Sequence, residues 1–207
     1  MMDHQIRTVA QLRELVGEPV HPILYDKASS RLTDPIKSYI RLSPFLALAT
    51  HAADGSTDVS PRGDAPGFVQ IVDDQTLVIP DRPGNKRHDS VINIIEDGRV
   101  AMLFMIPNVL ETVRVNGKAV ISTDPELLTQ AQVGGKVPKL AIVVEVQEAF
   151  GHCSKAFRRS KLWQKDYVPN DAVPTLAEMM AAHLEVKQEE REMLEDVIAR
   201  DAKENLY

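Results

Sequence analysis

The chain lacks paired cysteines and long apolar runs. Cys153 is the single cysteine among 207 residues, so no internal disulfide can form, and a reducing compartment is expected. The longest apolar run, Val100 to Ile106, is far too short to span a membrane. The first residues lack the apolar stretch of a signal peptide. These absences predict a cytoplasmic protein with no membrane partner.

An excess of basic charge is also missing. The net charge is −6, which argues against general binding to nucleic acid or to a membrane surface. The six histidines show neither an HExxH motif nor paired Cys/His spacing, so no metal site is expected. No GxGxxG or phosphate-loop pattern occurs. Any anion site must therefore be a local basic cluster.

Short strand patterns with helices between them make up most of the chain. Strands are expected over residues 45–50, from 57 to 60 or beyond, and over 68–72, 77–79, 100–106, 112–122 and 140–146. Helices are expected over residues 8–16, 33–41, 88–96, 124–133 and, as one or two long elements, 175–203. Residues 18–30 have no clear period and are expected to form a loop.

This order of elements favours an antiparallel β-barrel with helices, an α+β fold, over a regular strand–helix alternation. The all-apolar run 100–106 predicts a strand that is buried on both faces. We expect a single domain over residues 1–207, with a barrel core at about 40–152 and a helical C-terminal extension at about 154–205.

The first segment that could carry chemistry is Ser60-Pro61-Arg62-Gly63-Asp64-Ala65-Pro66-Gly67. Glycine and proline shape the backbone here and allow a ligand to approach closely. Small neighbours leave the Arg62 guanidinium room to reach a planar acceptor. The alternative is a hairpin loop with an exposed arginine.

The second segment is Pro80-Asp81-Arg82-Pro83-Gly84-Asn85-Lys86-Arg87-His88, which follows a strand and leads into a helix. A helix N-terminus has free N–H groups and a partial positive charge. Cations placed there would add charge-assisted hydrogen bonds, and phosphate is bound by this combination. The alternative is a solvated basic turn.

The third segment runs from Cys153 to Trp163 and holds four cations and the only tryptophan. A basic helix with an aromatic end can cover a phosphorylated, planar ligand. The alternative is a surface helix with Phe157 and Trp163 docked into the core.

Together these segments resemble the pyridoxamine 5′-phosphate oxidase-related FMN-binding family, from about Ile40 to Trp163. The resemblance is carried by residues 60–64, 79–82, 84–87, 103–107 and 111–117. It implies a split β-barrel, a twofold homodimer and two FMN molecules at the subunit interface. It also implies one continuous strand over residues 112–122, kinked or bulged at Gly117, whereas local rules make Asn116-Gly117 a hairpin turn.

The resemblance further implies where the cofactor binds. Lys86 and Arg87 would hold the phosphate, and Arg62 and residues 79–82 would lie near the flavin ring and ribityl chain. The 153–163 segment would lie near the cofactor, including that of the partner subunit. The full set of expected FMN-binding residues is Arg62, Ile79, Pro80, Asp81, Arg82, Asn85, Lys86, Arg87, Arg114, Lys155, Arg159 and Trp163.

The expected function is that of an FMN-dependent oxidoreductase acting on a small organic substrate or on NAD(P)H. Arg62, and after it Arg114, is expected to stabilise the anionic reduced ring, and no general base is demanded. The oxidase proper ends in an arginine- and histidine-rich segment, whereas this chain ends in Asp201-Ala202-Lys203-Glu204-Asn205-Leu206-Tyr207, so pyridoxamine phosphate is not the expected substrate. The alternatives are a non-catalytic FMN-storage or sensor protein and a haem-handling split barrel.

Overall fold

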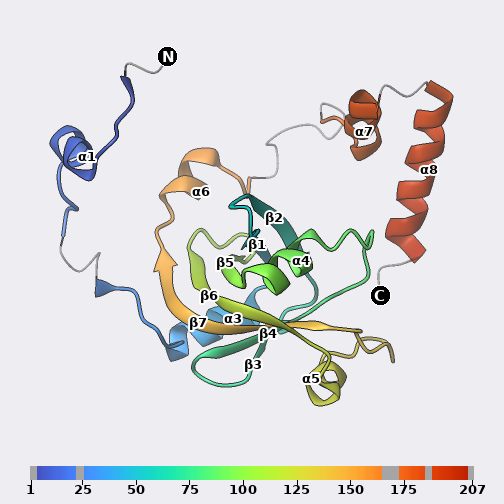
Figure 1. Ribbon diagram of the computed structural model, residues 1–207, viewed down its shortest axis with the longest axis horizontal. Helices are drawn as coiled ribbons and strands as arrows, with labels where there is room; N and C mark the ends of the chain where they lie inside the picture. The colour runs from blue at the N-terminus through green and yellow to red at the C-terminus, as the bar shows by residue number, and fades with distance from the viewer. Residues whose placement is uncertain (1–3, 22–25, 165–172, 185–187, 205–207) are drawn as a thin grey trace.

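The computed structural model describes residues 4–21, 26–164, 173–184 and 188–204 (Figure 1). The helices are α1 (Val9–Val16), α3 (Asp34–Leu42), α4 (Asp89–Glu96), α5 (Pro125–Gln130), α6 (Lys155–Ser160), α7 (Leu176–Leu184) and α8 (Gln188–Glu204). The strands are β1 (Phe45–His51), β2 (Thr57–Gly63), β3 (Gln70–Ile71), β4 (Thr76–Pro80), β5 (Arg99–Met105), β6 (Thr112–Ser122) and β7 (Ala141–His152).

One seven-stranded sheet forms the body of the protein. Its strand order is β2-β1-β5-β6-β7-β4-β3, and every pairing is antiparallel. The sheet curls around a core that includes Leu46, Phe104, Val115 and Ile142, all fully buried. β2 and β3 are the edges of the sheet. The predicted antiparallel split barrel with added helices is confirmed.

Local sequence signals set the starts of two helices as predicted, whereas the predicted cap Thr33 of α3 makes no side-chain capping hydrogen bond. The Thr8 side chain accepts a hydrogen bond from the Gln11 backbone N–H, and the Gln11 side chain bonds back to the Thr8 N–H, which completes a capping box for α1. The Asp124 side chain caps α5 through the Glu126 N–H. The predicted helix over 124–133 is too long, since α5 ends at Gln130.

Strand β2 runs further than the turn-rich sequence suggested. The segment from Ser60 to Gly63 pairs in register with β1, with Arg62 opposite Leu46. A proline fits here because β2 is an edge strand, so Pro61 interrupts no central ladder. The alternative reading of this segment as a hairpin loop with an exposed arginine is therefore wrong.

Strand β3 is shorter than predicted. Gly67 has a φ of +89°, and the Phe68 N–H donates to the Ala65 carbonyl oxygen, so the chain is still turning where a strand was expected to begin. Only Gln70–Ile71 forms a ladder. Phe68 contributes to the core without being part of the strand.

Strand β5 is fully buried on one face only. Val100, Met102 and Phe104 are buried, whereas the alternate residues from Ala101 to Met105 are half-buried. The prediction of two buried faces is wrong for this chain on its own. The apolar outer face of β5 is left partly open to solvent.

The long strand β6 is continuous through Asn116-Gly117, as the family resemblance implied. The register shifts between these two residues, which marks a β-bulge, and Val115 pairs with Met102 and Ala149 and not with Lys118. A Cβ atom at Gly117 would lie 2.1 Å from the Glu145 carbonyl oxygen. The crowded bulge therefore requires glycine.

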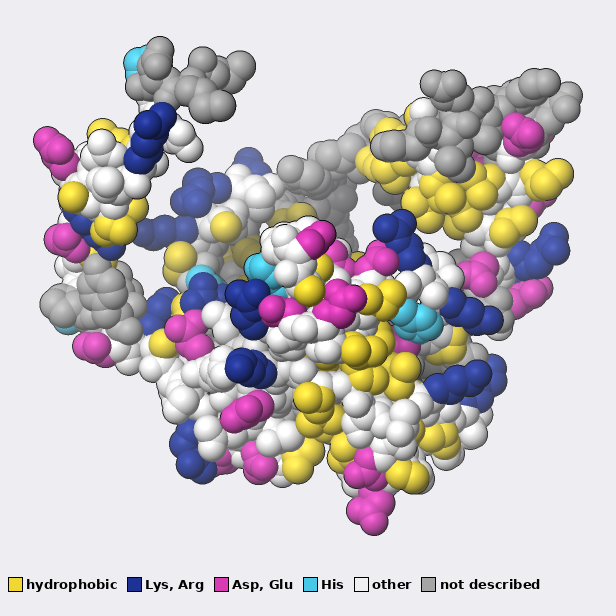
Figure 2. Space-filling view, in the orientation of Figure 1, with side chains coloured by type: hydrophobic (Ala, Val, Ile, Leu, Met, Phe, Trp, Pro, Cys, Tyr) yellow, Lys and Arg dark blue, Asp and Glu magenta, His cyan; other side chains and the backbone are white. Residues whose placement is uncertain are grey.

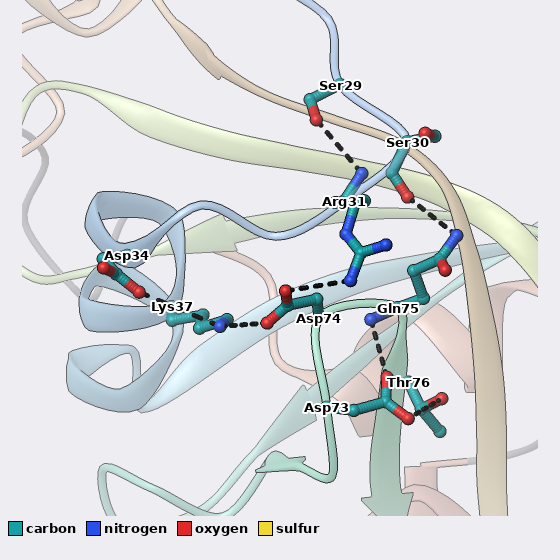
Figure 3. A network of polar contacts seen from close by, with 9 residues as sticks. All are labelled: Ser29, Ser30, Arg31, Asp34, Lys37, Asp73, Asp74, Gln75 and Thr76. Atoms are coloured by element: carbon teal, nitrogen blue, oxygen red, sulfur yellow. Dashed lines mark hydrogen bonds and ion pairs between the residues drawn. The ribbon is translucent and has the colours of Figure 1, made fainter.

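A polar network ties the segment before α3 to the β3–β4 turn (Figure 3). Asp74 accepts from Arg31 at 3.1 Å and from Lys37, and the hydrogen bonds from Lys37 and then Arg31 lower the pKa of this carboxyl group. The Leu32 N–H donates to the Asp74 carbonyl oxygen at 2.7 Å. This network fixes one end of the barrel.

The terminal helices lie outside the barrel (Figure 1). No residue of α1 is buried, and α7 and α8 confirm the predicted C-terminal helices. None of the helices in the described ranges is both long and apolar enough to cross a membrane. The loop expected over 18–30 is described only in part, and residues 205–207 at the chain end also lie outside the described residues.

Candidate functional site

Two reciprocal ion pairs connect the ends of strands β2 and β4. Arg62 Nη1 lies 2.9 Å from Asp81 Oδ1, and Arg82 Nε lies 2.7 Å from Asp64 Oδ2. Each pair joins one residue from the end of β2 to one from the end of β4. The side chains are 18%, 13%, 16% and 3% exposed, so the pairs are shielded from solvent. We call this region the seam.

The seam carries a small cavity of about 240 Å³. It is lined by Pro61, Arg62, Gly63, Phe68, Pro80, Arg82 and Pro83. Proline, glycine and phenylalanine line it beside two arginines, the only charged residues of its lining, and more of the lining surface is polar than apolar. Such a surface suits a planar ligand that carries an acceptor atom for a guanidinium group.

The turn before α4 has an unusual backbone. Lys86 and His88 have φ values of +60° and +57°, while Arg87 between them does not have a positive φ. Left-handed residues in such a turn can point backbone N–H groups to one side, as in an anion-binding nest, and we call residues 86–88 the nest. Such strain in residues other than glycine occurs most often at functional sites. The nest lies at the N-terminus of α4, which favours negative charge.

Other groups already use part of this turn. The Asn85 side chain accepts from the Arg87 N–H at 3.0 Å, which holds the turn in shape. Arg87 Nε lies 2.6 Å from the Asp89 carboxylate, and the Arg87 side chain is 77% exposed. Lys86 is exposed. An anion at the nest would therefore share Arg87 with Asp89 and meet Lys86 directly.

A chain of hydroxyl and carboxylate contacts fixes α4 to β2. Arg62 Nε donates to the Ser60 Oγ at 3.2 Å, and Ser60 Oγ lies 3.0 Å from Ser90 Oγ in the first turn of α4. Ser90 is buried and donates to Asp58 at 3.1 Å. The chain positions the seam arginine and the helix N-terminus relative to each other.

A second cavity, of about 420 Å³, lies between this turn and the start of β7. It is lined by Asp81, Arg82, Pro83, Gly84, Lys86, His88, Lys136, Val137, Pro138, Lys139 and Leu140. The sequence reading missed Lys136 and Lys139, which lie some fifty positions beyond the turn. The available signal was Lys-Val-Pro-Lys directly before a strongly apolar strand.

Not every predicted site residue reaches this region. The Ile79 side chain is fully buried in the core and is not available to a ligand. Arg82 donates to Asp64 and, at 2.8 Å, to the Ala131 carbonyl oxygen, so it holds two loops together where the two cavities meet.

Arg114 lies on the opposite face of the sheet from Arg62. Arg62 pairs with Leu46, which faces the core, so Arg62 lies on the core-facing side of the sheet. On β6, Val113 lies in the same cross-strand row, and Arg114 is the next residue, so its side chain lies on the other face. Arg114 Nη2 lies 2.6 Å from Glu148 Oε1, and its guanidinium stacks over Phe150 at 4.3 Å. Within one chain, the two arginines do not meet.

Helix α6 and the turn before α4 lie on different sides of the barrel (Figure 1). Trp163 donates through Nε1 to the Val109 carbonyl oxygen at 2.9 Å, and its ring stacks on Phe157. Lys155 and Arg159 are exposed. Figure 2 shows basic and acidic side chains interspersed over the visible face, with no single basic surface there.

A comparison with protein-family models identifies the family of the chain. A model of the pyridoxamine 5′-phosphate oxidase family matches residues 32–153, which cover most of the barrel and both cavities. The chain belongs to the pyridoxamine 5′-phosphate oxidase family. Within it, the barrel is of the FMN-binding split-barrel type. A search of curated proteins finds no match.

Solved structures similar to this family member include three bacterial proteins. A histidine-to-alanine variant of HupZ from Group A Streptococcus is 23% identical with a TM-score of 0.48, and the match covers 58% of this chain and 99% of that one. A putative pyridoxamine 5′-phosphate oxidase from Lactobacillus delbrueckii is 21% identical (TM-score 0.45, 59% and 95% covered). An FMN-binding protein from Syntrophomonas wolfei is 15% identical (TM-score 0.42, 70% and 97% covered). None of these likenesses carries an argument about this chain's ligand.

Proposed function

We propose that this protein binds FMN along the seam and acts as an FMN-dependent oxidoreductase on a small organic substrate or on NAD(P)H. The observation that carries the proposal is the continuity of residues 80–88. One end of this segment borders the seam cavity, which Arg62 also lines, and the other end forms a cationic nest at a helix N-terminus. A flavin mononucleotide has the same two-part chemistry, since a planar ring is linked to a single phosphate.

The residues present fit the cofactor at both ends. The nest at Lys86–His88, with the Lys86 and Arg87 side chains, offers the backbone donors and charges that a phosphate needs. The seam cavity offers proline and phenylalanine side chains against which a ring can pack, and Arg62 adds a fixed donor. We assign Lys86, Arg87 and Asn85 to the phosphate end and Arg62 to the ring end.

When bound, FMN supplies the redox chemistry, as acceptor and donor of a hydride or of electrons. The protein supplies position and charge. Arg62 is held by Asp81 on one side and Ser60 on the other, so its guanidinium is fixed before a ligand arrives. A preorganised cation stabilises negative charge that develops on a nearby ring. Asp81 offsets part of that charge, which limits how strongly Arg62 favours the reduced form.

A second copy of the chain completes the site in this proposal. Arg114 and the residues Lys155, Arg159 and Trp163 do not lie near the nest within one chain, so they can contribute only across a dimer interface. The half-buried outer face of β5 is an apolar surface that such an interface would cover. A twofold axis would then form two equivalent sites.

The identity of the cofactor tests the proposal. Protein purified and then incubated with FMN should be yellow, show a flavin spectrum and release FMN on denaturation, as measured by chromatography. FAD or haem as the bound group, or no binding after FMN loading, would contradict it. Steady-state oxidation of NADH or NADPH by the loaded protein separates an oxidoreductase from the alternative, a non-catalytic FMN-storage or sensor protein.

A further inference from the structure

The cavity beside the nest has a wall that the FMN phosphate does not require. The turn of residues 85–88 forms one side, and the segment from Lys136 to Leu140 forms the other. Lys86 and His88 of the nest line this cavity, whereas Asn85 and Arg87 of the proposed phosphate site do not. The cavity therefore begins at the nest and extends toward the start of β7.

Several backbone constraints build this far wall. Gly134 and Gly135 both have positive φ, which is the geometry of a type I′ turn, and Val133 and Lys136 exchange backbone hydrogen bonds of 3.1 and 2.9 Å across it. The Asp81 N–H donates to the Leu140 carbonyl oxygen at 3.0 Å, so the far wall is bonded to the near one. The wall is held in place without a ligand, and such preorganisation favours binding.

The lining of the cavity combines apolar surface with positive charge. The apolar residues are Pro83, Val137, Pro138 and Leu140, and the basic residues are Arg82, Lys86, His88, Lys136 and Lys139. The lining has one acidic residue, Asp81, which pairs with Arg62 and lies 3.7 Å from His88, and Arg82 pairs with Asp64 outside the lining. The three lysines still make the lining more basic than acidic, in a protein with a net charge of −6. It selects for a ligand that is apolar and negatively charged.

The volume limits the size of that ligand. A dry cavity of about 150 Å³ accommodates one benzene ring. A cavity of about 420 Å³ therefore has room for a body of one or two rings with an anionic substituent. It is too small to enclose a whole dinucleotide.

We propose that this cavity is the substrate site, and that it binds a small organic anion with an apolar body of one or two rings. Lys136 and Lys139 hold the carboxylate or phosphate, and Val137, Pro138 and Leu140 contact the body. The inference rests on the proposed function, because a ligand is a substrate here only if FMN occupies the neighbouring seam. The nest and the seam specify the cofactor, whereas this cavity specifies the class of substrate.

The test uses 1-naphthyl phosphate as the probe, with neutral 1-naphthol and inorganic phosphate as its two halves. Binding to the FMN-loaded protein is measured by calorimetry. We expect 1-naphthyl phosphate to bind more tightly than either half. Lys136→Ala combined with Lys139→Ala should weaken it by about a hundredfold, roughly tenfold for each charge-assisted hydrogen bond lost. The affinity for FMN should not change.

Lys118→Ala is the matched control, because Lys118 is exposed on β6 and does not line this cavity. It should leave both affinities unchanged. The two single variants at 136 and 139 are also measured, and alanine retains the backbone hydrogen bonds of the turn.

The outcomes separate this inference from the proposed function. If the double variant weakens the binding of FMN and of the probe alike, the lysines belong to the cofactor site. This result overturns the inference, whereas the proposal that the protein binds FMN stands. If inorganic phosphate binds as tightly as 1-naphthyl phosphate, or if the probe does not bind, the proposed substrate class is wrong. If FMN does not bind but the probe still depends on both lysines, the proposed function fails and the assignment of an anion site stands.

Discussion

At the scale of the residue, the four charged side chains of the seam have structural partners beside any role in binding a ligand. Arg82 was expected to bind FMN, but its guanidinium bonds to Asp64 and to the Ala131 carbonyl oxygen. The Asp64 side chain is only 3% exposed, and a buried carboxylate needs a paired cation to offset the loss of solvation. Arg82 therefore holds the seam closed, and its role in binding FMN stays a prediction.

Replacing Arg82 should cost stability whether or not a flavin is bound. Arg82→Ala breaks a shielded ion pair, for which a loss of about 3 kcal/mol in the free energy of unfolding is expected. Urea unfolding of the flavin-free protein measures it. Arg87→Ala is the matched control, because the Arg87–Asp89 pair is exposed and worth about 1 kcal/mol or less. Equal losses in the two variants would contradict a structural role that is specific to Arg82.

At the scale of the element, sequence signals within a few residues of one another are sufficient to predict much of the fold. The cap at Thr8, the Asp124-Pro125 start of α5 and the apolar alternation of the strands depend on neighbours in sequence, and the structure confirms those elements. Strand β2 was underestimated because Ser60–Gly63 reads as a turn unless an edge position is known.

Long-range contacts account for most of what the sequence did not reveal about the site. The pairing of Arg62 with Asp81 and the approach of Lys136 to the turn before α4 join segments that are distant in the chain. No local pattern encodes such distances. The anion nest was predicted only as a basic helix start, because the left-handed conformations of Lys86 and His88 belong to the folded backbone.

The bulge in β6 gives a sharp prediction for one element. Gly117→Ala would force a Cβ atom against the Glu145 carbonyl oxygen, and backbone atoms cannot move as easily as side chains. We expect a loss of about 3 kcal/mol in the free energy of unfolding, from overpacking of the strand pair.

Gly151→Ala on β7 is the control for this variant, because a Cβ atom there would make only one contact, at 4.0 Å, and the residue does not have a positive φ. Its stability in urea should stay close to that of the parent protein. If Gly117→Ala is equally well tolerated, the close approach of β6 and β7 at the bulge is wrong.

At the scale of the whole molecule, the account depends on a second copy of the chain. One barrel leaves the outer face of β5 half-buried and the nest on a different side from α6 (Figure 1). The seam cavity has a volume of about 240 Å³, which is below the roughly 300–1,000 Å³ of typical ligand pockets. The dimer is proposed to supply the missing wall.

Dilution should therefore release the cofactor and separate the subunits together. Sedimentation combined with flavin fluorescence can follow both events in one experiment, and the two transitions should coincide in protein concentration. A stable monomer that keeps FMN at unchanged affinity would contradict the shared site and move the whole binding surface into one chain.

The central claim is that the turn before α4 binds the phosphate of FMN, and the difference in affinity between FMN and riboflavin tests it most directly. The parent protein should bind FMN far more tightly than riboflavin, because the two differ only in the phosphate. Lys86→Ala combined with Arg87→Ala should remove most of that difference, since each charge-assisted hydrogen bond contributes about 1.5–3 kcal/mol. Riboflavin binding should hardly change. Equal weakening of both ligands, or an unchanged preference for FMN, would contradict the account.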